Sequence, residues 1–180
     1  MATDEAGRHC PDHTLDALTA YDPALCASPA GHYATFSRAG TLVFSSGVVG
    51  REAGTVITGK LKDARCLPRG QHAAKAAVLA LLRAAQREFG SLRRVQKVVS
   101  LTGFLHADEG FKPLREVMDA ASLLLQEVFP EAALPARTCV AVAGLPGGGV
   151  AEVALVLEVA DQPGANVSVG AASIGGRQRH

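Results

Sequence analysis

Two long segments of helical periodicity, separated by a β-rich run, constrain the fold of this chain more than any other feature. Apolar side chains recur at helical spacing over residues 71–89 and again over 113–129, and Gly90 supplies a stop for the first segment. Between them, residues 95–104 (VQKVVSLTGF) are β-branched and apolar, which predicts a strand. The apolar helical positions are Ala74, Val78, Leu81, Leu82, Ala85 and Phe89 in the first segment and Leu114, Val117, Met118, Ala121, Leu125 and Val128 in the second.

Further extended runs before and after these helices predict two hairpins. YATFS (33–37) and TLVFSSG (41–47) surround an Ala-Gly turn, and TCVAVAGL (138–145) and VAEVALVLEV (150–159) surround a Gly-rich reversal. Each helical segment is long enough to cross over a sheet. The expected fold class is therefore α+β, as a two-layer domain with a mixed β-sheet and two helices on one face.

The last predicted strand indicates that both faces of the sheet are covered. Residues 150–159 carry apolar side chains on both alternating sets of positions, so neither face of the strand is expected to be fully exposed to solvent. The two sets are Val153, Leu155, Leu157 and Val159, and Glu152, Ala154, Val156 and Glu158. Because the helices cover one face only, self-association is expected to cover the other.

The length of 180 residues favours one domain. We expect an N-terminal extension over residues 1–30 with a short helix around 15–21, a domain over 31–160 that includes a long loop at 50–68, and a Gly/Ala/Ser-rich tail over 161–180.

Composition disfavours nucleic-acid and membrane functions. Eighteen Lys and Arg against seventeen Asp and Glu give a formal charge of +1, and there is no Trp and only two Tyr to stack on bases. No apolar run reaches the length of a membrane span, and the four cysteines are scattered without a CxxC pair. These features predict a cytoplasmic protein with reduced thiols.

Several short motifs lack the context that their chemistry needs. GTVITGK (54–60) fits the start of a phosphate-binding loop, but Leu61 stands where a hydroxyl should bind Mg²⁺. Cys10 and His13 have a CxxH spacing without the second ligand pair of a zinc site, so no metal is expected. His72 and His106 come without an evident carboxylate partner and are interpreted as surface or loop residues.

Arg137 and Glu152 form a more informative pair. Arg137 starts an otherwise apolar strand and Glu152 lies within the predicted hairpin partner, where burial is costly for a charge without a partner or ligand. An arginine fork binds a carboxylate, and a glutamate can hold and activate water. An ordinary cross-strand ion pair explains the same spacing equally well.

The motifs GHYATFSRAGTLVFSSG, FGSLRRVQKVVSLTGFLHADEGF, PARTCVAVAGLP and GVAEVAL together resemble the RidA/YjgF family of reactive-intermediate deaminases over residues 31–160. The sequence is most similar to the branch labelled endoribonuclease L-PSP or chorismate-mutase-like. The resemblance implies a chorismate-mutase-like fold and a homotrimer with clefts between subunits. It also implies hydrolysis of enamine and imine intermediates, such as 2-aminoacrylate, to 2-oxo acids and ammonia.

Carried over by position, the resemblance assigns catalysis to Arg137, which would grip the substrate carboxylate, and Glu152, which would orient the attacking water. It assigns substrate contacts to Tyr33, Ser46, Gly47 and Cys139, and it implies a small carboxylate ligand with no cofactor.

Two departures from the better-known deaminases bear on activity: Val48 replaces a glutamine after SSG, and a longer loop occupies 106–110. A non-catalytic trimeric metabolite-binding protein and, less favoured by charge and composition, an endoribonuclease are the alternatives.

Overall fold

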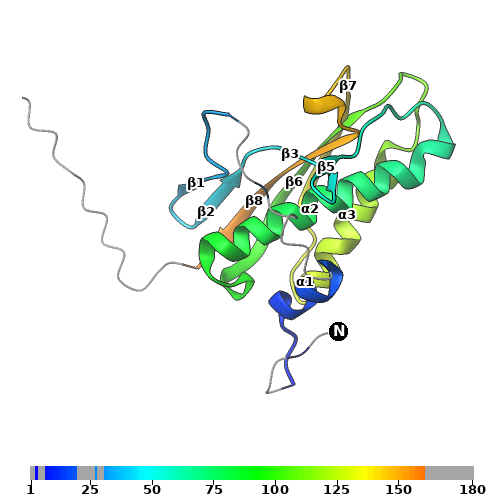
Figure 1. The fold of residues 1–180 in the computed structure, drawn as a ribbon. Helices are drawn as coiled ribbons and strands as arrows, with labels where there is room; N and C mark the ends of the chain where they lie inside the picture. Colours follow the sequence, from blue (N-terminus) through cyan, green and yellow to red (C-terminus); the bar gives the residue numbers. More distant parts are fainter. Residues whose placement is uncertain (1–2, 4–6, 20–26, 28–30, 161–180) are drawn as a thin grey trace, which may run out of the picture.

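The computed structural model describes Thr3, residues 7–19, Ala27 and residues 31–160 (Figure 1). Its helices are α1 (Pro11–Thr19), α2 (Leu67–Phe89) and α3 (Leu114–Val128), with short 3-10 turns at Ala64–Cys66, Leu92–Arg94 and Pro146–Gly148. Its strands are β1 (Phe36–Ala39), β2 (Leu42–Ser45), β3 (Val48–Val49), β4 (Arg51–Glu52), β5 (Thr55–Val56), β6 (Val95–His106), β7 (Ala136–Val142) and β8 (Ala151–Val159). The predicted tail, 161–180, lies outside the described residues.

The predicted α+β fold with a mixed sheet is confirmed. The strand order is β1-β2-β8-β6-β7, β3 pairs with β8, and every pairing in this sheet is antiparallel except that of β6 with β7. The first hairpin is also confirmed, because β1 pairs with β2 from Phe36↔Ser45 to Ala39↔Leu42. Gly40 takes a φ of 61° in the turn, a backbone conformation that residues other than glycine rarely adopt.

The second predicted hairpin is wrong, because β7 and β8 do not pair with each other. The 12-residue β6 lies between them, parallel to β7 and antiparallel to β8. Helix α3 is the crossover that makes β6 and β7 parallel neighbours, and the Gly-rich segment then carries the chain past β6 to its other side. A glycine-rich turn signal shows that the chain reverses, but not which strand it joins.

The core lies between the sheet and the two long helices, which Figure 1 shows on the same side of the sheet. Every second residue of β8, from Ala151 to Val159, is buried, and α2 and α3 bury the apolar stripes that predicted them. The approach is close at Gly103, where an added Cβ would lie 2.6 Å from Met118 Cε. Gly90 ends α2 with a φ of 80°, as its sequence position predicts.

Part of the predicted N-terminal extension packs onto this domain. Helix α1 starts earlier than expected, at Pro11, and its Leu15 is fully buried. Asp12 accepts hydrogen bonds from Gln86 Nε2 and Leu92 N, both at 2.9 Å. The buried Arg83 of α2 donates to Asp16 at 2.5 Å, so polar contacts fix the orientation of this helix.

The segment predicted as a long loop at 50–68 contains ordered structure. β4 and β5 form a small antiparallel sheet whose turn holds Ala53 and Gly54 at positive φ, and this turn accounts for the glycine that begins GTVITGK. Lys60 at the end of that motif forms an ion pair with Asp108 of the 106–110 loop. Within the described residues, no helix is long and apolar enough to cross a membrane.

Candidate functional site

The sequence-predicted site residues fall into two groups, and the two groups lie on opposite faces of the sheet. Leu101 of β6 pairs with both Arg137 and Leu155, and Leu101 and Leu155 are buried under the helices. Phe104, three residues further along β6, pairs with Glu152. Because side chains alternate along a strand, Arg137 projects toward the helices and Glu152 toward the open face.

The first group lies where β7 passes under α3. Arg137 Nη1 donates to Asp119 Oδ1 at 2.7 Å and to Ser122 Oγ at 3.0 Å, and its side chain is 22% exposed. Both partners come from α3, three residues apart and therefore on one helix face. The guanidinium is consequently held in place by one anion and one hydroxyl.

Cys139 belongs to the same group, two residues along β7 on the same face. Its Sγ donates to the Leu114 carbonyl at 3.5 Å, and burial raises the pKa of its thiol. A thiol with a raised pKa carries little thiolate at neutral pH, so this cysteine is unsuited to act as a nucleophile. The geometry leaves it a packing and backbone-contact role.

The second group surrounds the Glu152 carboxylate. Gly47 lies directly against this side chain: a Cβ added at position 47 would be 2.8 Å from Glu152 Cδ and would collide with Oε1. Burial raises the pKa of Glu152, and none of the described residues donates a hydrogen bond to its carboxylate. Glu152 is thus a partly desolvated carboxylate that is open to a proton or a water molecule.

Ser46 anchors the neighbouring segment through two hydrogen bonds. Its backbone N–H donates to the Thr35 carbonyl at 2.9 Å and its hydroxyl to the Ala34 carbonyl at 2.7 Å. Tyr33 precedes this segment and is 51% exposed. The structure therefore brings together Glu152 and Gly47, with Ser46 next in the chain and the Tyr33 segment bonded to it.

The face that carries Glu152 exposes large apolar side chains. Phe44, which pairs with Val156, is 45% exposed, and Val140, which pairs with Phe104, is 39% exposed. Among the described residues, the helices cover the opposite face only. Exposed apolar side chains on paired strands form the kind of surface that associates with another protein surface.

Sequence reasoning missed Asp119 and Ser122. The only signal is that two polar residues three positions apart interrupt an apolar helical segment, a pattern that fits a solvent-facing helix side equally well. It also missed a partner of His72, whose Nε2 lies 3.2 Å from Glu52 Oε1 in an exposed pair. In the part of the chain that the structure describes, no three His, Cys, Asp or Glu side chains converge as a metal site would require.

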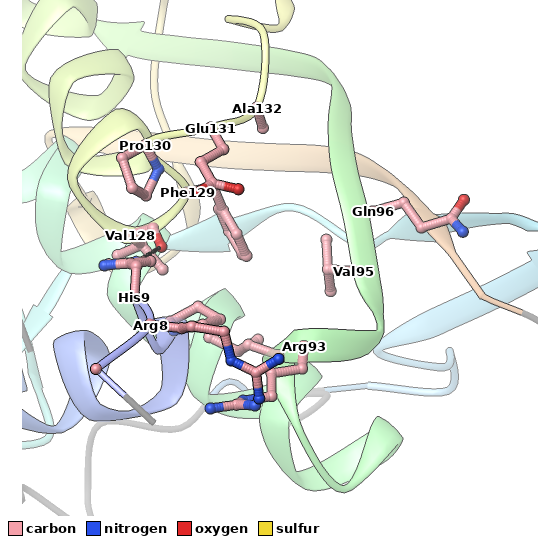
Figure 2. Close-up of a pocket in the computed structure, with 13 residues that line it drawn as sticks. Arg8, His9, Arg93, Val95, Gln96, Val128, Phe129, Pro130, Glu131 and Ala132 are labelled. Carbon is pink, nitrogen blue, oxygen red and sulfur yellow. Dashed lines mark hydrogen bonds between the residues drawn. The ribbon is translucent and has the colours of Figure 1, made fainter. Parts of the chain in front are cut away.

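A cavity of about 720 Å³ lies away from both groups, between the segment before α1, the start of β6 and the end of α3 (Figure 2). Arg8 and Arg93 bring their guanidinium groups to one side of it, and Val95 and Phe129 also line it. His9 Nε2 contacts the Val128 carbonyl at 2.8 Å in its wall. None of the sequence-predicted site residues lines this cavity.

Comparison with known proteins places the fold and the motifs in a family. A family model described as Endoribonuclease L-PSP matches residues 24–159. Protein TCP17 of Trypanosoma cruzi is 33% identical over 135 residues, which cover 74% of this chain and 84% of that protein.

Solved structures share the fold of this chain. Atu1372 of Agrobacterium tumefaciens, described as a protein of unknown function, is similar with a TM-score of 0.73 at 26% identity, over 84% of this chain and 94% of its own. A Shewanella oneidensis MR-1 protein that is provisionally called an endoribonuclease is similar with a TM-score of 0.76 at 22% identity, over 84% of this chain and 100% of its own.

Proposed function

The chain belongs to the endoribonuclease L-PSP family, also called YjgF/RidA, and from this premise we propose that it hydrolyses reactive enamines and imines of the 2-aminoacrylate type to 2-oxo acids and ammonia. The observation that carries the proposal is that this chain presents two complementary groups, one on each face of its sheet. A guanidinium held by α3 is suited to bind a carboxylate, and a desolvated glutamate is suited to hold water.

The proposed site draws Arg137 from one copy of the chain and Glu152 from another. Within one chain the two side chains project from opposite sheet faces, and β6 lies between their strands, which separates the backbones by about 10 Å. The apolar open face that carries Glu152 supports association with further copies. A homotrimer with clefts between its subunits satisfies both requirements.

In the proposed reaction, Arg137 binds the substrate carboxylate through donors that are not bonded to Asp119 or Ser122. Glu152 accepts a proton from water while the water oxygen bonds to the carbon of the protonated imine, which gives a carbinolamine. Glu152 returns that proton to the nitrogen, and the C–N bond breaks as ammonia leaves. The hydroxyl of the carbinolamine gives its own proton to Glu152 as it becomes the carbonyl of the 2-oxo acid. No organic cofactor is required, because the imine carbon is already electrophilic.

The raised pKa of Glu152 supports this double use. A carboxyl group with a pKa closer to neutrality accepts a proton as a base and returns it as an acid more effectively than one with an ordinary pKa. Gly47 leaves room for the carboxylate at that position.

A second candidate function is metabolite binding without turnover. The observation that favours it is the Arg137–Asp119 ion pair, because an arginine already paired with a carboxylate attracts a substrate anion less strongly. Ribonuclease activity, for which the family is named, is a third possibility that the near-neutral charge disfavours.

One assay distinguishes the three candidate functions. Purified protein is added to a dehydratase that releases 2-aminoacrylate or its four-carbon homologue, and the appearance of 2-oxo acid is followed against uncatalysed hydrolysis, with RNA as a parallel substrate. Acceleration that Glu152→Gln abolishes supports the deaminase. Ligand binding without acceleration selects the binding protein, and RNA cleavage that survives Glu152→Gln contradicts the proposal.

A further inference from the structure

The Asp119 carboxylate beside Arg137 has a chemical consequence for the ligand. We propose that Asp119 recognises the cationic nitrogen of a ligand whose carboxylate is bound by Arg137, so that this half of the site selects zwitterionic α-imino or α-amino acids over simple carboxylates. The inference rests on the proposed function, because it takes Arg137 as the carboxylate clamp.

The geometry of the ion pair leaves polar atoms of both side chains that can still form hydrogen bonds. One oxygen of Asp119 and one nitrogen of Arg137 make the 2.7 Å contact, and Ser122 Oγ accepts from that same nitrogen. Among the described residues, nothing is hydrogen-bonded to Asp119 Oδ2 or to Arg137 Nη2 and Nε. The pair therefore presents one unused acceptor edge next to unused donors.

Exposure places these unused groups within reach of a ligand. The Asp119 side chain is 48% exposed and the Arg137 side chain 22% exposed, so neither is sealed into the core. Asp119 also lines a small groove between α2 and α3, of about 250 Å³, which contains Lys75 and Glu127 as its other charged groups. A carboxylate in the core would serve packing alone, whereas a half-exposed one can bind a solute.

The charges of a zwitterion match those of the pair. In an α-amino acid and in a protonated α-imino acid, one carbon atom bears both the cationic nitrogen and the carboxylate. Laid alongside the pair, the carboxylate meets the guanidinium and the nitrogen meets Asp119. A plain monoanion meets the same guanidinium but is repelled by Asp119, so the pair favours the zwitterion.

Asp119 would also favour the reactive form of the substrate. A protonated imine is more electrophilic at carbon than a neutral one, and a neighbouring carboxylate stabilises the protonated form. The water held by Glu152 would then add to the imine carbon while Asp119 holds the nitrogen. The nitrogen would leave as ammonia after it has taken up the proton that Glu152 returns. Substrate recognition and activation would share one residue.

The test compares two ligands of the same skeleton, L-alanine and L-lactate, which differ in an ammonium group against a hydroxyl. Calorimetry on the wild type, Asp119→Asn and the control Glu88→Gln, an exposed carboxylate near the end of α2, measures both dissociation constants. The amide of Asn keeps an oxygen for Arg137 Nη1 but carries no charge. We expect Asp119→Asn to weaken the binding of alanine about tenfold and to leave the binding of lactate unchanged or about threefold tighter. Glu88→Gln should change neither dissociation constant.

Asp119→Glu keeps the charge and should retain the preference for alanine. This second variant keeps the test valid if Asp119→Asn fails to fold. An equal loss of both ligands in Asp119→Asn would overturn the inference, because it would show that Asp119 only orients Arg137. Equal binding of both ligands by the wild type would overturn it as well. If the wild type binds neither ligand, or if Arg137→Ala binds both as the wild type does, the clamp itself fails and the proposed function with it.

Discussion

Arg137 and Glu152 are fifteen positions apart in the sequence, yet their side chains leave the same sheet on opposite faces. Arg137 sits beneath α3 and is bonded to Asp119, while Glu152 lies against Gly47 on the face that α2 and α3 leave uncovered. A reaction that needs both groups around one small molecule must therefore take them from different copies of the chain.

This relationship predicts complementation between two inactive variants. Arg137→Ala and Glu152→Gln should each lose activity alone, because each lacks one half of every site. Mixed trimers formed by denaturing and refolding the two together in equal amounts should recover about one quarter of the wild-type sites. The 2-oxo acid assay measures the recovery, with each variant refolded alone as the control. A mixture that stays inactive while mixed oligomers form would place both residues in one chain's site.

Gly47→Ala should reduce activity with little change in stability. The new methyl group would collide with the Glu152 carboxylate, the mobile end of a long side chain, which can move aside at small cost. A displaced catalytic carboxylate should lower kcat on the order of tenfold to a hundredfold. Gly144→Ala is the matched control, because an added Cβ there meets no atom within 4 Å. Steady-state kinetics and thermal unfolding decide, and an unchanged kcat for Gly47→Ala would exclude Glu152 from the reaction.

Phe44→Glu should disrupt assembly. Phe44 is 45% exposed on the face that carries Glu152, and a charge buried in an interface is strongly unfavourable. Leu123→Glu is the control, because Leu123 is 64% exposed but lies on α3, in the helical layer. Sedimentation equilibrium should give a trimer for the wild type and for Leu123→Glu, and a smaller species for Phe44→Glu. A trimer that Leu123→Glu breaks and Phe44→Glu leaves intact would move the interface to the helices.

Glu152→Gln should stabilise the protein at neutral pH and not in acid. Burial raises the pKa of Glu152 in the folded state above its unfolded value, so its favourable contribution is present below the unfolded pKa and is lost as pH rises through the folded pKa. The side chain is partly exposed, and a rise in Tm of only about 1–3 °C at pH 7 is expected for the variant. Thermal unfolding at pH 7 and pH 4 checks this, with a smaller difference at pH 4. A lower Tm for the variant at pH 7 would mean that the ionised carboxylate has a stabilising partner.

Asp12→Ala should weaken the attachment of α1. Asp12 accepts hydrogen bonds from Gln86, Ser91 and the Leu92 backbone, and its removal leaves these donors without that acceptor. A loss of about 1–3 kcal/mol in the free energy of unfolding is expected. Glu88→Ala, on the exposed end of α2, serves as the control in urea denaturation. Equal stability of the Asp12→Ala variant and the wild type would show that α1 adds nothing to the folded domain.

Local pattern was sufficient for much of the fold. The apolar stripes of α2 and α3, the glycine that ends α2 and the alternation along β8 are properties of neighbouring residues, so they could be predicted without knowledge of any distant contact. The family could be identified in the same way, because its motifs around Arg137 and Glu152 are short runs of sequence.

The order of the strands depended on tertiary structure. The Gly-rich reversal after β7 predicted a hairpin, but one edge of β6 pairs with β7, which follows the crossover helix, and its other edge pairs with β8. Turn residues encode a change of direction, whereas the partner of a strand is decided by which edge remains unpaired.

Which residues meet in the candidate site also depended on tertiary structure. Sequence spacing placed Arg137 and Glu152 in adjacent strands, but the face that each side chain takes follows from its register against β6, and the contact of Arg137 with Asp119 and Ser122 follows from where α3 crosses the sheet. The sequence by itself determined which chemical groups this protein carries and which elements hold them. The packing of those elements decided which groups meet, because a shift of one residue in register moves a side chain to the other face.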